Sequence, residues 1–315
     1  MNRIWILMAS IVLCLVGLIL LVDDFQAKRG YPPLFKSADS PVSERPLTKN
    51  HPDQKKATPP AKSLPTRVPR TPVSDAPVAK VRGAIILDDI GLDLSVAKEL
   101  LEIEVPLCFS ILPARQYSTQ IAELAHRQGK VIMAHIPMEA RNPEKMHSGL
   151  PWLLVGMNPS KIEKITLSIL KQIKYAQGAN NHTGSRFTTY KPGLEIFLSS
   201  LKRQGMFFID SRTTVNTKAY EMAQSMGIPS AERNVFFDDR DDVTEIATQC
   251  DRFINYALRE GQAIGIGHPK KNTITVLKKY IPIFKQKGIT LVPVTDLLTP
   301  SITPEYLALK QAHHN

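Results

Sequence analysis

Residues 84–91 read AIILDDIG, which is four apolar residues, two consecutive aspartates, an isoleucine and a glycine. A short, wholly apolar run bounded by polar residues is typical of a strand that is buried on both faces. Strands of that kind belong to parallel sheets, whose two faces are covered by other elements. We therefore interpret Ala84–Leu87 as a strand of a parallel sheet, with Asp88 and Asp89 at its carboxyl end.

Further short apolar runs follow along the chain, and they alternate with amphipathic segments. We expect strands at Ala84–Leu87, Leu107–Leu112, Val131–Ala134, Gly178–Asn181, Met206–Ile209, Asn234–Phe237, Ala263–Gly267 and Thr290–Val294. We expect helices at Leu94–Leu101, Ser118–Gln128, Pro159–Tyr175, Gly193–Arg203, Thr217–Ser225, Val243–Glu260 and Asn272–Lys287. This alternation predicts an α/β fold, a distorted (β/α) barrel of seven or eight parallel strands. A doubly wound open sheet is the alternative.

Carboxylates and imidazoles recur where the expected strands end, namely Asp88-Asp89, His135, His182, Asp210, Asp238-Asp239 and His268. A single polar residue in such a place is explained equally well as a turn former. Their recurrence favours a shared site, because active sites of parallel barrels gather at the carboxyl ends of the strands. Histidine nitrogens and aspartate oxygens are the ligands of a zinc-type divalent metal.

The aspartate pair has a chemical logic of its own. Consecutive residues of a strand point to opposite faces, but both can reach one site where the strand breaks into a loop. One carboxylate can then bind a metal while its neighbour stays free as a base. The alternative is a surface pair that begins a turn, which the apolar AIIL before it makes less attractive.

Six segments, taken together with their order and spacing, point to a known family. They are AIILDDIG (84–91), PLCFSILP (106–113), HIPMEA (135–140), NNHTGSRFT (180–188), FFIDSRTT (207–214) and GIGHP (265–269). The set resembles the divergent polysaccharide deacetylases over roughly residues 82–298. The resemblance implies a distorted (β/α) barrel related to metal-dependent deacetylases that remove acetyl groups from N-acetylglucosamine units.

The resemblance also implies roles for individual residues. Asp88 matches the general base of the related deacetylases, and Asp89 matches a metal ligand. His135 matches the first histidine ligand, but the chain reads HIPME there, so Glu139 stands where a second histidine is expected. His182 is our candidate for the missing ligand, and Glu139 is the alternative. The implied cofactor is a divalent metal, for which we expect zinc.

Three further assignments concern catalysis and substrate. His268, at the end of IGIGH, resembles the histidine that acts as general acid in the related enzymes. Asp210 and Arg212 match a segment that orients catalytic groups, so we expect Asp210 to take part in catalysis and Arg212 to contact the substrate. Trp152, in the loop MHSGLPWLL, is a candidate for stacking on a sugar ring, and a packing role explains it equally well.

The amino terminus has the pattern of a signal anchor. An uncharged run of 19 residues, Ile4–Val22, follows Arg3 and precedes two aspartates. At about 1.5 Å per residue it nearly spans a hydrocarbon core of about 30 Å. No small-residue cleavage site follows, although a cleaved signal peptide is the alternative. The position of Arg3 predicts a single-pass inner-membrane protein with its folded domain in the periplasm.

The composition changes several times along the chain and suggests four segments. Prolines recur through YPPL, SPVSERP and ATPPAKSLPTRVPRTPVSDAP with few large apolar residues, which is typical of a disordered, semi-rigid spacer. The expected segments are a signal anchor (1–23), a Pro-rich linker (24–80), a deacetylase-like barrel (81–300) and a carboxyl-terminal tail (301–315).

The net charge of +11 is unevenly distributed. Residues 1–80 hold 12 Lys and Arg against 6 Asp and Glu, so over half of the excess lies outside the expected barrel. A basic tether favours anionic surfaces such as lipid headgroups. Because the chain has no recognisable RNA- or DNA-binding motif, we expect no nucleic-acid partner. The three cysteines (Cys14, Cys108, Cys250) form no metal-binding or disulfide pattern.

Two functional hypotheses follow from these features. The first is a metal-dependent amidohydrolase that acts on N-acetyl groups of a cell-wall glycan, and the retained Asp88-Asp89 pair and His268 favour it. The second is a non-catalytic glycan-binding or regulatory module with cell-envelope protein partners. The missing histidine in HIPME and the long tether favour this second hypothesis.

Overall fold

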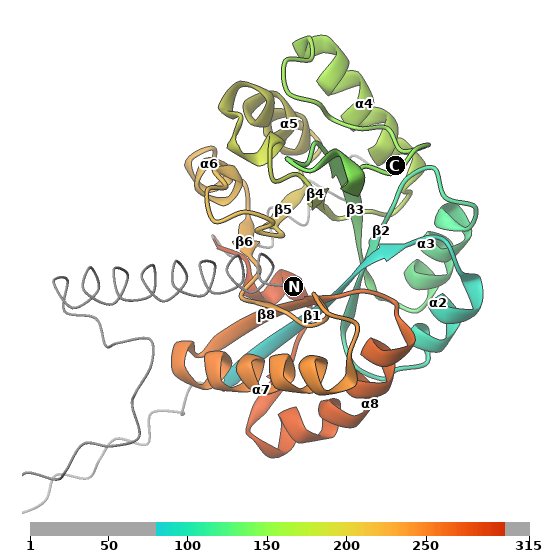
Figure 1. Ribbon diagram of the computed structural model, residues 1–315, viewed down its shortest axis with the longest axis vertical. Helices are drawn as coiled ribbons and strands as arrows, with labels where there is room; N and C mark the ends of the chain where they lie inside the picture. Colours follow the sequence, from blue (N-terminus) through green and yellow to red (C-terminus); the bar gives the residue numbers. More distant parts are fainter. Residues whose placement is uncertain (1–79, 300–315) are drawn as a thin grey trace, which may run out of the picture. The chain divides into compact units, whose positions relative to one another are not determined.

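The pairings between the named strands are all parallel and join nine strands into one curved sheet. The computed structural model describes residues 80–299, drawn in colour in Figure 1. The strands are β1 (Val81–Ile90), β2 (Leu107–Ile111), β3 (Val131–Met138), β4 (Gly178–Thr183), β5 (Phe207–Asp210), β6 (Ser230–Glu232), β7 (Val235–Phe236), β8 (Gln262–Gly267) and β9 (Ile289–Leu291). Their order is β6-β5-β4-β3-β2-β1-β8-β7, and β9 pairs with β1. The predicted parallel α/β fold is confirmed.

Helices cover the outer side of this sheet (Figure 1). They are α2 (Leu94–Leu101), α3 (Ser118–Arg127), α4 (Pro159–Gln172), α5 (Lys191–Arg203), α6 (Ala219–Ser225), α7 (Val243–Glu260) and α8 (Lys271–Gln286). Three short 3₁₀ turns accompany them, namely η1 (Pro143–Lys145), η2 (Phe187–Thr189) and η3 (Val294–Leu297). Two helices, α2 and α7, have the bounds expected from the sequence.

Side-chain alternation along the strands builds two separate apolar cores. In β1, Ile85 and Leu87 belong to the larger core, which the sheet forms with the helices. Ala84 and Ile86 belong to a smaller core on the inner face, which Val294 of η3 also joins. This alternation, with a period of two residues, decides which polar side chains can face the interior.

The two edge strands of the sheet, β6 and β7, follow each other directly in the sequence. β6 pairs with β5, β7 pairs with β8, and only Arg233 and Asn234 separate β6 from β7. The backbone N–H of Arg233 donates to Asp210 O (3.0 Å), and that of Asn234 donates to Ile264 O (2.9 Å). A parallel half-barrel is therefore bridged between its edges by a crossing segment, which an open doubly wound sheet does not have.

Four strands continue past their expected carboxyl ends: β1 to Ile90, β3 to Met138, β4 to Thr183 and β5 to Asp210. The side chains expected just after these strands, Asp88, Asp89, His135, His182 and Asp210, therefore lie within them. β6 has only three residues and was not expected, because a run that short has no periodicity to detect.

The described residues contain no helix that is long and apolar enough to cross a membrane. The predicted signal anchor, nearly all of the predicted linker and the predicted tail lie outside residues 80–299.

Candidate metal and catalytic site

The aspartate pair lies at an irregularity at the carboxyl end of β1. Between Leu87 and Ile90 the register with β2 shifts, and Asp89 has a positive φ of 57°. Asp88 is on the inner face by alternation, and the irregularity turns its neighbour toward the same site. As a result, His135 Nε2 lies 3.7 Å from Asp88 Oδ2 and 3.2 Å from Asp89 Oδ1. Left-handed backbone at a non-glycine residue is strained, and such strain clusters at functional sites.

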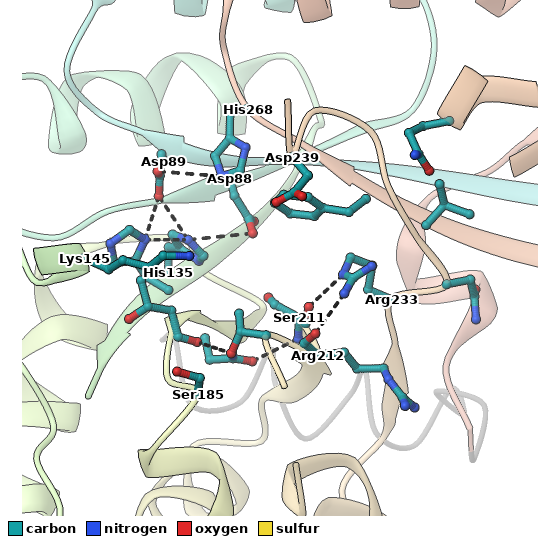
Figure 2. A pocket seen from close by; sticks show the side chains of 18 of the residues that line it. Asp88, Asp89, His135, Lys145, Ser185, Ser211, Arg212, Arg233, Asp239 and His268 are labelled. Carbon is teal, nitrogen blue, oxygen red and sulfur yellow. Dashed lines mark hydrogen bonds and ion pairs between the residues drawn. The ribbon is translucent and has the colours of Figure 1, made fainter. Parts of the chain in front are cut away.

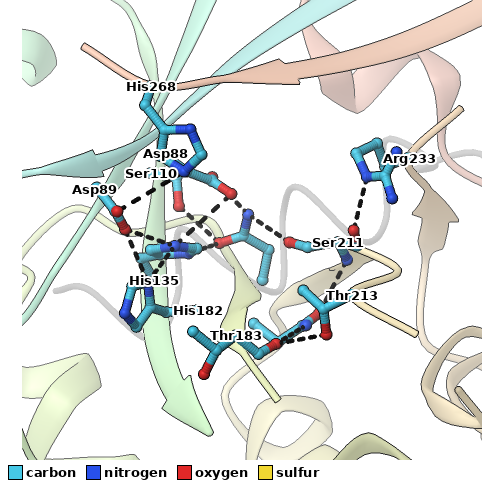
Figure 3. A network of polar contacts seen from close by, with 12 residues as sticks. Asp88, Asp89, Ser110, His135, His182, Thr183, Ser211, Thr213, Arg233 and His268 are labelled. Carbon is cyan, nitrogen blue, oxygen red and sulfur yellow. Dashed lines mark hydrogen bonds and ion pairs between the residues drawn. The ribbon is translucent and has the colours of Figure 1, made fainter. Parts of the chain in front are cut away.

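Asp89, His135 and His182 converge on one point (Figure 3). Asp89 Oδ1 lies 2.8 Å from His182 Nδ1, and His182 Nδ1 lies 3.3 Å from His135 Nε2. A tetrahedral metal with bonds of about 2.0–2.1 Å holds its ligand atoms about 3.3 Å apart. The three atoms therefore have the chemistry and the spacing of a ligand group that could hold a divalent metal.

Asn180 determines which nitrogen of His135 carries the proton. Its Nδ2 donates to Asp88 Oδ1 (2.8 Å), and its Oδ1 therefore faces the ring, 2.7 Å from His135 Nδ1. Since Oδ1 is an acceptor, Nδ1 must donate, which leaves a lone pair on Nε2 of the neutral ring. That lone pair is directed at the Asp89 carboxylate, and this arrangement is favourable only when a cation or a proton lies between them.

Among the described residues, the buried His182 Nε2 has no hydrogen-bond partner, and Asp89 Oδ1 has only the two imidazole nitrogens as neighbours. A buried polar atom without a partner costs free energy unless a ligand compensates it. Burial raises the pKa of Asp89, but the neighbouring His135 and His182 outweigh this effect and hold the pKa well below its ordinary value. The carboxylate is therefore ionised at neutral pH, and the group fits a metal ion.

His268 lies on the other side of Asp89 and is held by a carboxylate of its own. Its Nδ1 is 2.8 Å from Asp238 Oδ1, and its backbone N–H donates to Asp238 Oδ2 (2.7 Å). Thr273 Oγ1 also donates to Asp238 Oδ2 (2.6 Å). Burial lowers the pKa of His268, but the contact with Asp238 outweighs it and raises the pKa overall. Its free Nε2 is 3.7 Å from Asp89 Oδ2.

These groups open into a cavity of about 980 Å³ (Figure 2). Seven of the residues singled out from the sequence line it: Asp88, Asp89, His135, His182, Arg212, Asp239 and His268. The volume is at the upper end of the range for small-molecule sites, about 300–1,000 Å³. It leaves room for more than an acetyl group.

Comparison with known proteins identifies the family. Residues 85–298 match the sequence profile of the divergent polysaccharide deacetylases. The chain belongs to this family. It is 32% identical over 244 residues to an uncharacterized Escherichia coli protein, YibQ, with 76% of each chain covered. It is 31% identical over 200 residues to an uncharacterized Haemophilus influenzae protein, covering 64% of this chain and 71% of that one.

One solved structure shows the same fold. It is a crystal structure of an uncharacterized protein from Agrobacterium tumefaciens, with a TM-score of 0.64 and 22% identity. The likeness covers 70% of this chain and 91% of the other.

Asp210, predicted to take part in catalysis, is not among the residues that line the cavity. In β5 the inner face carries Ile209, so Asp210 points outward. Its carboxylate accepts hydrogen bonds from Thr217 Oγ1 (2.7 Å) and from the backbone N–H groups of Arg212 (2.8 Å) and Tyr220 (3.2 Å). Burial raises its pKa. Asp210 therefore holds a loop together, and the carboxylate that contacts His268 is Asp238.

The alternative ligand Glu139 is also engaged elsewhere. Its Oε2 accepts from the backbone N–H of Val155 (2.6 Å), and its Oε1 pairs with Arg186 Nη1 (2.6 Å). Glu139 is not part of the ligand group, whereas His182 is. Its two contacts tie the end of β3 to the loops that follow β3 and β4.

The two residues assigned to substrate contact have different surroundings. Arg212 lines the cavity and pairs with Glu232 Oε2 (2.5 Å). Trp152 is not a lining residue. Its ring centre is 5.7 Å from that of His182, and its Nε1 donates to His147 O (3.0 Å). The indole thus lies beside a candidate ligand and is fixed by its own loop.

Sequence reasoning missed Asn180 and gave Asp238 no role. Asn180 is fully buried and, besides its bonds to His135 and Asp88, accepts from Ser110 Oγ (2.6 Å). The sequence does contain a signal for Asn180. It precedes His182 by two residues, so in a strand its side chain must lie on the same face as that of His182.

Proposed function

We propose that this protein removes acetyl groups from N-acetylated sugars of a cell-wall glycan in a metal-dependent hydrolysis. The observation that carries the proposal is the convergence of an Asp-His-His ligand group with Asp88 and His268 in one cavity. Asp89, His135 and His182 are the residues that would hold the metal, and zinc suits this ligand set. When bound, the metal supplies Lewis acidity, which activates water and polarises the acetamide carbonyl.

The protein's own groups provide the proton transfers. Asp88 Oδ2 lies beside the ligand group and takes a proton from the attacking water, while the Asn180 amide fixes Asp88 Oδ1. His268 Nδ1 is directed at Asp238, so Nε2 is the atom that donates a proton to the departing sugar nitrogen. The amide C–N bond breaks, and the products are acetate and a free amine.

The carboxylate of Asp238 keeps His268 in the tautomer that this step needs. Burial raises the pKa of Asp238, but the hydrogen bond from His268 outweighs that effect and lowers the pKa overall. An ionised Asp238 stabilises the protonated ring and fixes its orientation. His268 can therefore hold a proton at Nε2 until the amine leaves.

The decisive experiment compares acetate release and metal content in the wild type and in Asp88→Asn. The substrates are N-acetylglucosamine oligomers and purified peptidoglycan. Asparagine can still accept the hydrogen bond from Asn180, so we expect the variant to keep its metal and to lose about 10²–10⁴-fold in rate. Metal binding without acetate release from any acetylated glycan by the wild type would contradict the proposal and favour the binding module.

We also propose that the protein is held in the inner membrane with its folded domain in the periplasm, as the Ile4–Val22 run suggests. Protease added to spheroplasts should then digest the domain, and a salt wash should not release the protein. Recovery of the intact chain in the cytosolic fraction would contradict this placement.

A further inference from the structure

The cavity extends beyond the proposed reaction site along one face of α7. Gln249, Arg252, Asn255, Tyr256 and Arg259 line it, and their spacing of three or four residues places them on one side of the helix. Arg233, in the segment that crosses between β6 and β7, lines the same cavity. We call Arg233, Arg252 and Arg259 the arginine arm.

The arginine arm begins close to the proposed general acid. The Phe236 ring centre lies 5.3 Å from that of His268 and 5.1 Å from the guanidinium carbon of Arg233. The Arg233 guanidinium therefore lies within about 10 Å of the His268 ring. A substituent on the reacting sugar, or on its neighbour in a glycan chain, can reach from one to the other. Figure 2 shows Arg233 facing the cavity across from Asp88.

Two of the three arginines of the arm have no ion-pair partner among the described residues. Away from Asp88 and Asp89 the cavity lining holds five cationic side chains (Lys145, Arg212, Arg233, Arg252, Arg259) and two carboxylates (Glu144, Asp239). Among residues 80–299, no carboxylate lies within ion-pair distance of Arg233 or Arg252, whereas Arg259 pairs with Glu260. Arg233 Nε and Nη2 donate only to the backbone oxygens of Ser211 (2.7 Å) and Arg212 (2.8 Å).

Arg233 is thus a half-buried cation with donors to spare. A guanidinium has five N–H groups, and the two bonds to backbone oxygens leave three of them free. Burial and the neighbouring Arg212 lower the pKa of Arg233, and the carboxylates of Asp210, Asp88 and Asp239 offset this only in part, so keeping this charge partly out of water still costs free energy. A bound oxyanion offsets that cost, because a desolvated charge gains most from a charged hydrogen-bond partner.

We infer that the arginine arm binds an oxyanion, a carboxylate or a phosphate, that is covalently carried by the glycan substrate. The planar amides of Gln249 and Asn255 and the ring of Tyr256 supply the hydrogen-bonding and stacking groups that suit sugars. The chain's own termini are poor candidates for this anion. Residues 1–79 carry 11 Lys and Arg against 6 Asp and Glu, and residues 300–315 carry one of each sign.

This inference rests on the proposed function for its substrate, so the test measures binding and turnover separately. Calorimetry on the full-length protein in the Asp88→Asn background avoids consuming the ligand. The probes are an N-acetylglucosamine oligomer, an oligomer of equal length with carboxylated alternate sugars, and one with phosphorylated alternate sugars. We expect one or both charged probes to bind at least about tenfold more tightly than the neutral one. The better probe identifies the anion.

Two substitutions test whether the arginine arm causes the preference for the charged probe, and a third controls for the change in net charge. Arg252→Gln should reduce the preference for the charged probe about three- to tenfold, since Arg252 makes no hydrogen bond or ion pair with the described residues that its loss could disturb. Arg233→Gln should reduce it at least as much. Arg127→Gln, at an exposed position of α3 outside the cavity, should leave the preference unchanged.

Three outcomes would overturn the inference. They are equal binding of the neutral and charged probes, an equal loss in Arg127→Gln, and equally tight binding of a single-stranded oligonucleotide, which would indicate a general polyanion surface. A charge preference without acetate release by the wild type refutes the proposed function alone. Acetate release without a charge preference refutes this inference alone.

Discussion

Replacing Asn180 by leucine should damage both the stability of the domain and its affinity for metal. Asn180 is fully buried. Its amide joins Asp88, Ser110 and His135 through hydrogen bonds of 2.8, 2.6 and 2.7 Å. Leucine has a similar size and can pack there, but it can neither donate nor accept.

The magnitude follows from the groups that lose a partner. Asp88 Oδ1, the Ser110 hydroxyl and His135 Nδ1 would each be left buried without the bond they now make. Each unsatisfied group costs about 1–3 kcal/mol, so the free energy of unfolding should fall by about 3–9 kcal/mol. Loss of a residue that orients a metal ligand also typically weakens metal affinity about 10–100-fold. Since domains are stable by only about 5–15 kcal/mol, the first effect is large.

Urea denaturation measures the free energy of unfolding, and titration with zinc measures the affinity. Thr166→Val is the matched control, because it also removes a buried polar group that bonds only to the carbonyl of Ile162 in its own helix (2.8 Å). It should cost about 1 kcal/mol and leave zinc affinity unchanged. If Asn180→Leu lost no more stability than this control and bound zinc normally, the network would not have the role assigned to it.

Further variants test the separate parts of the site. His182→Ala should lose most of the bound metal, whereas Glu139→Gln should keep it, because that carboxylate is already held by a backbone amide and an arginine; metal analysis showing the reverse would make Glu139 the ligand. Asp238→Asn should slow acetate release about a hundredfold with little change in KM, because the His268 ring loses its anionic partner; an unchanged rate would exclude the positioning role. Burial raises the pKa of Cys250 to about 12. At about pH 8 only about one thiol in 10⁴ is then ionised, so iodoacetamide should modify Cys250 only after unfolding, and labelling of the native protein would contradict its burial.

Much of the architecture was predictable from apolar periodicity. Four consecutive apolar residues in AIIL can be buried only if both faces of the strand are covered, which already implies a parallel sheet with helices around it. The two helices whose bounds match the expected ones, α2 and α7, begin after Asp93 and Asp242. The side chains of these aspartates cap the helices by accepting hydrogen bonds from backbone N–H groups of the first turn. Helix ends without such a signal, as at Gln172, were placed a few residues away.

The candidate site is only partly predictable from the sequence, and the position of Asp210 shows why. Asp210 was placed at the site because it ends a strand, but its immediate neighbour Ile209 occupies the inner face. The same alternation puts Asn180 and His182 on one face, so applying it strictly places Asn180 beside the cavity and Asp210 on the opposite face. Asp89 breaks the rule in the opposite direction, since the irregularity after Leu87 turns it toward the site. No pattern in a single sequence predicts such a shift in strand register.

The crossing segment between β6 and β7 connects the fold to both proposals. Because this segment leaves β5 and joins β8 within two residues, Arg233 lies over the gap between the sheet edges and bonds to the chain that follows β5. A few residues later the same segment places Asp238 against His268. A regular barrel would fill this gap with another pair of long strands. Here residues of the crossing segment line the cavity, so the irregular closure supplies both the carboxylate that holds His268, the proposed general acid, and part of the proposed cationic extension.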